Sequence, residues 1–240
     1  MVNDSFRTVV DAKTSRHWND ADFEPEFVNG RFVCLLQCSK PGCRETCAVS
    51  GNHDTTRGGE YGEILYPTGR PKSINPPPPM LHIPERCPKE VRSEVEAAFA
   101  LFWSDYAASL NRIRNALELV LTDLGVSRGK MSVKKLKPGS PPRLPGSPPP
   151  KKKLTRLSLH QRIELLEKKK PVLKDLCERM MAVKHLGNAG SHPGVVVEID
   201  DVFDGLDILD RVLIDMYSGH PRELTRTVKQ INQRKGPRKK

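Results

Sequence analysis

The stretch VEAAFALFWSDYAASLNRIRNALELVLTDLG, residues 95–125, carries apolar side chains at steps of three and four residues. Such steps place side chains on one face of an α-helix. Pro88 suits the start of a helix and Gly125 suits its end. The pattern therefore predicts one long helix between these two residues, with an apolar face made of Val95, Phe99, Phe102, Tyr106, Leu110, Ile113, Leu117, Val120 and Leu124.

Three more helices are expected after this one. LSLHQRIELLEKKK, residues 157–170, resumes the helical pattern, and Pro171 begins a third helix that ends at Gly187. Asp200 or Asp201 can cap a fourth helix. Four helices with one apolar face each predict an antiparallel bundle. The inward residues of the last two helices are Val172, Leu176, Met180 and Val183, then Val202, Leu206, Leu209, Leu213 and Met216.

A small β module is expected before the helices. FVNGRFVCLLQC, residues 27–38, has an Asn-Gly pair between β-branched and aromatic residues, which is a strong signal for a β-hairpin. GEYGEILYP, residues 59–67, is a further candidate strand, and the proline-rich residues after it favour an extended linker. The fold class is thus α+β, with a β-hairpin or zinc-ribbon-like module followed by an antiparallel four-helix bundle. The expected parts are an N-terminal segment 1–24, the β module 25–68, the linker 69–88, the helical domain 89–218 and a tail 219–240.

The positive charge is concentrated in an insert near the middle of the chain and in the C-terminal tail. Lys and Arg exceed Asp and Glu by 40 − 29 = 11, and residues 128–153 carry nine basic residues without an acidic one. We expect the insert 128–155 to be disordered because of its prolines and lysines. Basic segments attract nucleic-acid phosphates, and they serve equally for solubility or for contact with an acidic protein. The candidate nucleic-acid contacts are Lys151, Lys152, Lys153, Arg234, Lys235, Arg238, Lys239 and Lys240.

No apolar run approaches the roughly 18 residues that a membrane span needs, and the first residues lack the apolar block of a secretory signal. We therefore expect a cytoplasmic protein without a membrane partner, whose cysteines stay reduced. The sequence also lacks a glycine-rich phosphate loop, a serine nucleophile elbow and a carboxylate pair of defined spacing.

The N-terminal cysteines allow a structural zinc site. Cys38 and Cys43 bracket the turn SKPG, Cys47 follows, and His53 is close behind. Thiolates and an imidazole in such an order can hold one tetrahedral metal ion. Cys34 is expected in the core, because on a strand it lies roughly 13 Å from Cys38 at about 3.3 Å per residue. The alternative is that all these cysteines are reduced and only pack.

Several separated segments carry a family resemblance. LGNAGSHPG, residues 186–194, and DDVFDGLDILDRVLIDMY, residues 200–217, resemble the uncharacterised bacterial family of domain of unknown function 4145. Residues 81–121 are similar to the first helix of that family, and residues 32–51 to the cysteine-bearing β module that often precedes it. The likeness spans most of residues 18–218. That family is in turn similar to the HEPN superfamily of four-helix domains, which usually dimerise and include many metal-independent ribonucleases of host defence and toxin systems.

The resemblance implies candidate catalytic residues. The HEPN motif has an Arg, often followed by Asn, and a His four to six residues after the Arg. Asn188 and His192 match it, but Gly187 stands where the Arg is expected, so Lys184 or Arg114 would have to supply the cation. RNA cleavage needs an acid or base near neutral pKa and a cation beside the phosphate.

Two other interpretations of this segment stay open. Asn188 and His192 can instead satisfy helix ends at a structural junction, with Gly187 stopping the helix. The segment can also bind a ligand. Within the resemblance, we expect a non-catalytic binding or assembly module of a bacterial defence system, anti-phage or restriction-associated, that contacts nucleic acid or a partner protein and forms a homodimer. The alternative is a metal-independent HEPN-type ribonuclease that uses His192.

Overall fold

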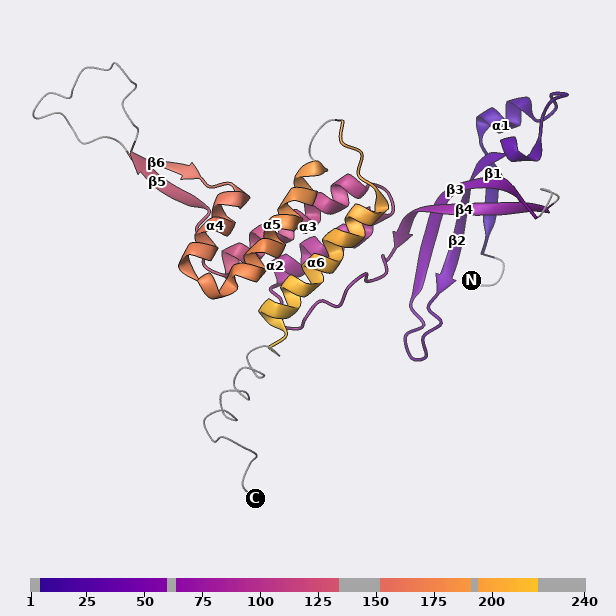
Figure 1. Cartoon of the computed structure of the whole chain (residues 1–240). Helices are drawn as coiled ribbons and strands as arrows, with labels where there is room; N and C mark the ends of the chain where they lie inside the picture. The colour runs from indigo at the N-terminus through magenta and orange to yellow at the C-terminus, as the bar shows by residue number, and fades with distance from the viewer. Residues whose placement is uncertain (1–4, 60–63, 134–151, 191–193, 220–240) are drawn as a thin grey trace, which may run out of the picture.

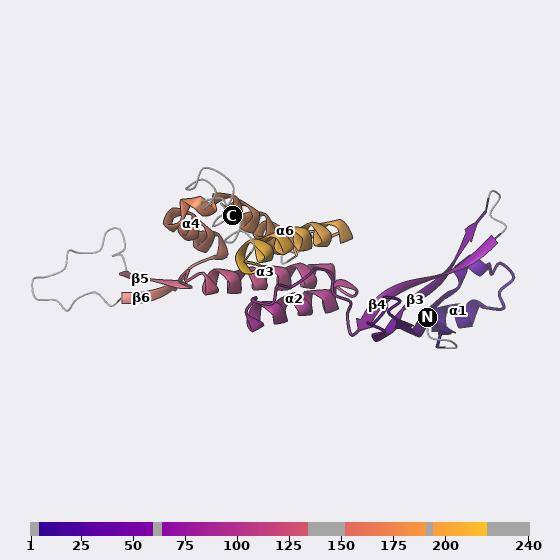
Figure 2. The ribbon, with the colours of Figure 1, turned by 90° about the horizontal axis from the view of Figure 1, so that it is seen from below.

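The computed structural model describes residues 5–59, 64–133, 152–190 and 194–219. The fold is mixed α+β, with an antiparallel sheet near the N-terminus followed by packed helices. Figures 1 and 2 show an elongated molecule, with the sheet at one end, the helices in the middle and a separate β-hairpin at the other end. The α+β fold class predicted from the sequence is therefore confirmed.

The N-terminal sheet has four antiparallel strands in the order of the chain. Alternate residues of the second strand point inward, where Phe32 and Cys34 pack with Val49 of the third strand. This burial confirms the small β module and the place of Cys34 in its core. The strands are β1 (Arg7–Val10), β2 (Asn29–Gln37), β3 (Thr46–Gly58) and β4 (Ile64–Asn75), with α1 (Ala12–His17) and a 3-10 turn (Pro25–Phe27) between β1 and β2.

The predicted hairpin turn at Asn29-Gly30 is wrong. Both residues lie inside β2, and Gly30 pairs with Val10 on one side and His53 on the other. A Cβ atom at Gly30 would lie 2.5 Å from the Val9 carbonyl oxygen, so glycine is needed for the close approach of β1. The connection between β2 and β3 lies instead at residues 38–45. The sheet thus takes in β1 from the segment 1–24, and β4 extends to Asn75 in the predicted linker.

The helical part buries one large apolar core. Leu110, Ile113, Leu117 and Val120 are among its fully buried residues, as the apolar spacing of residues 95–125 predicted. Within the described residues this part has five α-helices, one more than the predicted four-helix bundle. They are α2 (Lys89–Phe102), α3 (Tyr106–Asp123), α4 (Leu159–Lys169), α5 (Lys174–Ala189) and α6 (Ile199–Tyr217).

The fifth helix arises because the predicted long helix is two helices. The chain turns at residues 103–105, and the Asp105 carboxylate accepts a hydrogen bond from the backbone N–H of Ala108 at 2.9 Å, which caps α3. The Ser109 hydroxyl of α3 donates to the Ala98 carbonyl of α2 at 2.9 Å, and Arg112 of α3 pairs with Glu94 of α2 at 3.3 Å. Because a later residue of α3 contacts an earlier residue of α2, the two helices run antiparallel. Figure 2 shows them side by side.

The basic insert is partly ordered, contrary to the prediction. Its two ends pair as the antiparallel strands β5 (Gly129–Val133) and β6 (Lys152–Arg156), which stand out beyond α3 and α4 (Figure 1). Residues 134–151, the middle of the insert, lie outside the described residues. Before β5, Gly125 has a φ of +74°, which supports its predicted role at the end of a helix.

Two details of the later helices differ from the prediction. Pro171 begins a 3-10 turn (Pro171–Leu173) before α5, and Val172 is exposed rather than inward. Gly187 does not stop α5, which continues to Ala189. The predicted cap of the last helix is close to the observed one, because the Asp201 carboxylate accepts from the backbone N–H of Glu198 at 2.9 Å.

Candidate functional site

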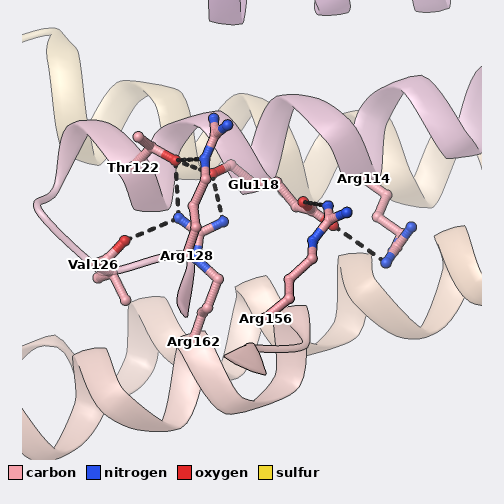
Figure 3. A network of polar contacts seen from close by, with 7 residues as sticks. All are labelled: Arg114, Glu118, Thr122, Val126, Arg128, Arg156 and Arg162. Atoms are coloured by element: carbon pink, nitrogen blue, oxygen red, sulfur yellow. Dashed lines mark hydrogen bonds and ion pairs between the residues drawn. The ribbon is translucent and has the colours of Figure 1, made fainter. Parts of the chain in front are cut away.

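Arginine side chains from three elements meet on α3. Arg114 of α3 lies 3.3 Å from the Glu118 carboxylate one turn later, and Arg156 at the end of β6 lies 3.7 Å from the same carboxylate. Figure 3 shows both guanidinium groups beside Glu118. The Arg156 side chain is 84% exposed, whereas those of Arg114 and Glu118 are half-buried. Glu118 therefore anchors two arginines, of which one is open to solvent.

Arg162 of α4 forms the buried part of this cluster. Only 2% of its surface is exposed, and its guanidinium donates to the Glu118 carbonyl at 3.0 Å, the Thr122 hydroxyl at 2.9 Å and the Val126 carbonyl at 3.1 Å. These acceptors lie in the last two turns of α3 and just beyond its end, where the helix dipole makes a cation favourable. Burial lowers the pKa of Arg162, yet an arginine stays charged. Arg162 thus fixes α4 to the end of α3.

The cluster has an excess of positive charge. Arg128 donates from Nε to the Thr122 hydroxyl at 3.1 Å, which brings a fourth arginine to the set (Figure 3). Four guanidinium groups and the single carboxylate of Glu118 give 4 − 1 = +3 within the drawn network. We name Arg114, Glu118, Arg128, Arg156 and Arg162 the arginine cluster. Because Arg128 and Arg156 are exposed, it can receive an anion from solvent.

Arg114 also fills the space beside Gly187. A Cβ atom at Gly187 would lie 2.6 Å from the Cβ of Arg114, so α3 and α5 cross closely there. Gly187, where the family resemblance led us to expect an arginine, therefore has no room for a side chain, and Arg114 of another helix occupies that space. Asn188 follows directly, and Lys184 lies one turn earlier on α5, half-buried. His192, the proposed acid or base, lies outside the described residues.

The structure places only some of the predicted nucleic-acid contacts. Lys152 and Lys153 lie in β6, next to the cluster in the chain. Lys151 and the tail residues Arg234, Lys235, Arg238, Lys239 and Lys240 lie outside the described residues. The sequence did not single out Arg128, Arg156 and Arg162. One signal was present, since Arg114, Glu118 and Thr122 form a polar stripe at steps of four on a helix with an apolar core face.

The predicted zinc ligands do not gather at one point. Cys38 and Cys43 are exposed in the connection between β2 and β3, and Cys47 is partly buried near the start of β3. His53 is six residues further along β3, about 20 Å from Cys47 at 3.3 Å per residue. In the described part of the chain, no three His, Cys, Asp or Glu side chains are grouped so that they could hold a metal ion. Zinc binding stays a prediction, one that requires the three cysteines to move together.

Comparison with known proteins identifies one family. A family model with the description Domain of unknown function (DUF4145) matches residues 95–234, more than half of the chain. The match begins within α2 and includes the whole arginine cluster. Comparisons with curated proteins and with solved structures give no match. Among the described residues, no helix combines the length and the apolar character that crossing a membrane requires.

Proposed function

The chain belongs to the family of domain of unknown function 4145, and from that premise we propose that its helical domain is a non-catalytic module that binds the phosphate backbone of nucleic acid. The arginine cluster carries the proposal. Arg128 and Arg156 expose guanidinium groups at its edge, and an arginine fork fits a phosphate with two parallel hydrogen bonds.

The surrounding sequence strengthens the attraction. Residues 128–156 contain ten basic residues and no acidic one, and the described ends of this segment form β5 and β6 beside the cluster. A local positive field raises the rate at which a polyanion associates with the protein. When the polyanion binds, the counterions condensed on its phosphates are released, which favours binding. The same positive charge would also attract a protein partner with an acidic surface. Binding of nucleic acid therefore has to be measured directly.

The test is binding of a labelled nucleic acid over a series of salt concentrations. We expect Arg128→Gln and Arg156→Gln each to weaken binding for every sequence and to reduce the slope of log K against log salt by about one. Arg211→Gln on α6 is the control, because it removes the same charge from an exposed arginine outside the cluster. Absence of binding at low salt, or equal binding by all variants, would overturn the proposal.

A ribonuclease is the second candidate, favoured by the contact between Arg114 and Gly187. The aliphatic part of Arg114 lies beside Gly187, the residue before Asn188, in the segment where the family resemblance expects the active motif. His192 would then act as acid or base, and Arg114 would stabilise the negative charge of the reacting phosphate. The pairing of Arg114 with Glu118 at 3.3 Å argues against this role, because part of its charge is already compensated.

RNA cleavage in the presence of a metal chelator separates the two candidates. We expect no cleavage by the wild-type protein. Cleavage that persists with chelator and is lost in both His192→Ala and Arg114→Gln would establish the ribonuclease and reject the non-catalytic module. Both variants require a check of folding by circular dichroism.

The proposal keeps three further expectations from the family resemblance. These are a role in bacterial defence, a protein partner and a homodimer. A location in the cytoplasm, where thiols stay reduced, is a fourth expectation of the proposal.

A further inference from the structure

The β5–β6 hairpin is a ribbon of two strands that stands away from the helices. Its register pairs Gly129 with Arg156 and Val133 with Lys152, and among the described residues no third strand joins it. Figures 1 and 2 show it leaving the helical part at the side opposite the N-terminal sheet. An isolated hairpin is only marginally stable in water, so a surface that covers it would stabilise it.

One face of this ribbon is apolar at its centre. Met131 and Leu154 lie directly opposite each other across the two strands, and they are 57% and 65% exposed. Neighbouring cross-strand side chains on one face contact each other and act as a unit. The pair therefore offers an apolar contact that the protein itself leaves open to solvent.

The base of the ribbon is positively charged and is joined to α3 by an ion pair. Arg128, Lys130 and Arg156 are exposed at its base. The backbone N–H of Leu157 donates to the Arg128 carbonyl at 2.9 Å, which continues the pairing of the two strands at the base of the ribbon. The ion pair of Arg156 with Glu118 connects the ribbon to α3. The ribbon thus begins at the arginine cluster.

From these features, and resting on the proposed function, we propose that the β5–β6 ribbon enters the major groove of duplex DNA. The major groove of B-form DNA is about 12 Å wide and admits a two-stranded ribbon, whose strands lie about 4.8 Å apart. The deep, narrow major groove of A-form RNA does not admit one. In this arrangement Met131 and Leu154 contact base edges such as thymine methyl groups, while Arg128, Lys130 and Arg156 reach the phosphates.

The first test uses the wild-type full chain and three probes of one sequence: a 20-base-pair DNA duplex, the single DNA strand and the RNA duplex. We expect the DNA duplex to bind about tenfold more tightly than the other two, a small specificity ratio for a groove contact. Methyl green, which occupies the major groove, should displace the protein, whereas netropsin, which occupies the minor groove, should not. Displacement by netropsin alone would overturn the inference.

The second test changes the apolar pair. Met131→Ser with Leu154→Ser should weaken binding of the DNA duplex about tenfold, leave binding of the single strand unchanged, and leave the salt slope unchanged because no cation is lost. Val172→Ser is the matched control, since this residue is 91% exposed outside the ribbon.

The outcomes separate the two proposals. If the serine variant binds duplex and single strand as the wild type does, and the wild type does not prefer the duplex, the ribbon inference fails while the proposed function stands. If the wild type binds none of the probes at low salt, both fail.

Discussion

The side chain of Arg162 combines near-complete burial with three hydrogen bonds to α3 and the loop after it. Replacing it with methionine roughly keeps the volume but removes the donor to the buried Val126 carbonyl and leaves the Glu118 carbonyl with the Thr122 hydroxyl as its side-chain donor. We expect Arg162→Met to lower the free energy of unfolding by about 2–4 kcal/mol, the cost of buried groups that lose a charged partner. Urea unfolding measures this loss.

Arg156→Met provides the comparison for this prediction. Its side chain is 84% exposed and makes a longer contact with Glu118, so we expect a change of only about 0.5 kcal/mol. Arg162→Lys should also be less stable than the wild type, because an ammonium group cannot reproduce the hydrogen bonds of the planar guanidinium. Equal stability of Arg162→Met and the wild type would show that the buried contacts contribute nothing net.

Tyr217 makes stability depend on alkaline pH. Its hydroxyl donates to the Asp123 carboxylate at 3.1 Å, and burial, then the charge of Asp123, raises its pKa above the ordinary value of 10.0. The folded state therefore holds the proton more tightly than the unfolded state does. The stabilisation is complete below pH 10 and is lost as the pH rises above it, by up to about 1.4 kcal/mol per pH unit.

Urea midpoints at pH 8, 10 and 11 test this sign. We expect the wild-type midpoint to fall between pH 10 and 11, and Tyr217→Phe to show a smaller fall. Some decline remains in the variant, because burial also raises the pKa of the Cys87 and Cys177 thiols above 9.0. A steeper fall in the variant than in the wild type would contradict the prediction.

At the scale of elements, the close crossing of α3 and α5 depends on glycine. At most helix positions alanine in place of glycine stabilises by about 1 kcal/mol. At Gly187 the added Cβ would lie 2.6 Å from the Cβ of Arg114, so we expect Gly187→Ala to destabilise by about 1–3 kcal/mol through overpacking. Thermal unfolding of the variant gives the sign directly.

A double-mutant cycle identifies the contact responsible. In the background of Arg114→Gly, which removes the Cβ that the new methyl group would meet at 2.6 Å, Gly187→Ala should destabilise less than it does in the wild-type protein. Additive changes in the free energy of unfolding would show that the strain comes from another contact between α3 and α5.

The two helices α2 and α3 show how far the sequence predicts the elements. The apolar positions and their burial were correct, because the core selects side chains by periodicity. The turn was missed because Phe102 and Tyr106 are four residues apart, so the helical spacing continues across the break. Asp105 was the available signal, since aspartate is a favoured N-cap.

The arginine cluster is harder to predict than the helices, because its residues are far apart in the sequence. Arg114 was identified through the family motif, but Arg162 and Arg156 come 48 and 42 residues later in the chain. Only the packing of α4 and β6 on α3 brings them to Glu118. In the same way, Gly30 was interpreted as a turn because the residues around it do not show that β1 will pair with it.

On the scale of the whole molecule, the two cores differ greatly in size. The core of the sheet consists of Phe32, Cys34 and Val49, whereas that of the helical part extends through all five helices. Met80, Leu81 and Ile83 of the linker pack against the helical core and thus belong to it. Since stability grows with buried apolar surface, the sheet should be the less stable part.

The two tryptophans report these parts separately in the intact chain. Trp18 lies at the end of α1 against Phe23, and Trp103 lies after α2 against Phe102. We expect fluorescence of the Trp103→Phe variant, which follows Trp18, to change at lower urea than fluorescence of Trp18→Phe, which follows Trp103. Two separate transitions would mean that the sheet unfolds while the helical part stays folded. Coincident midpoints, with circular dichroism following the same curve, would instead show that the sheet and the helices unfold as one cooperative unit.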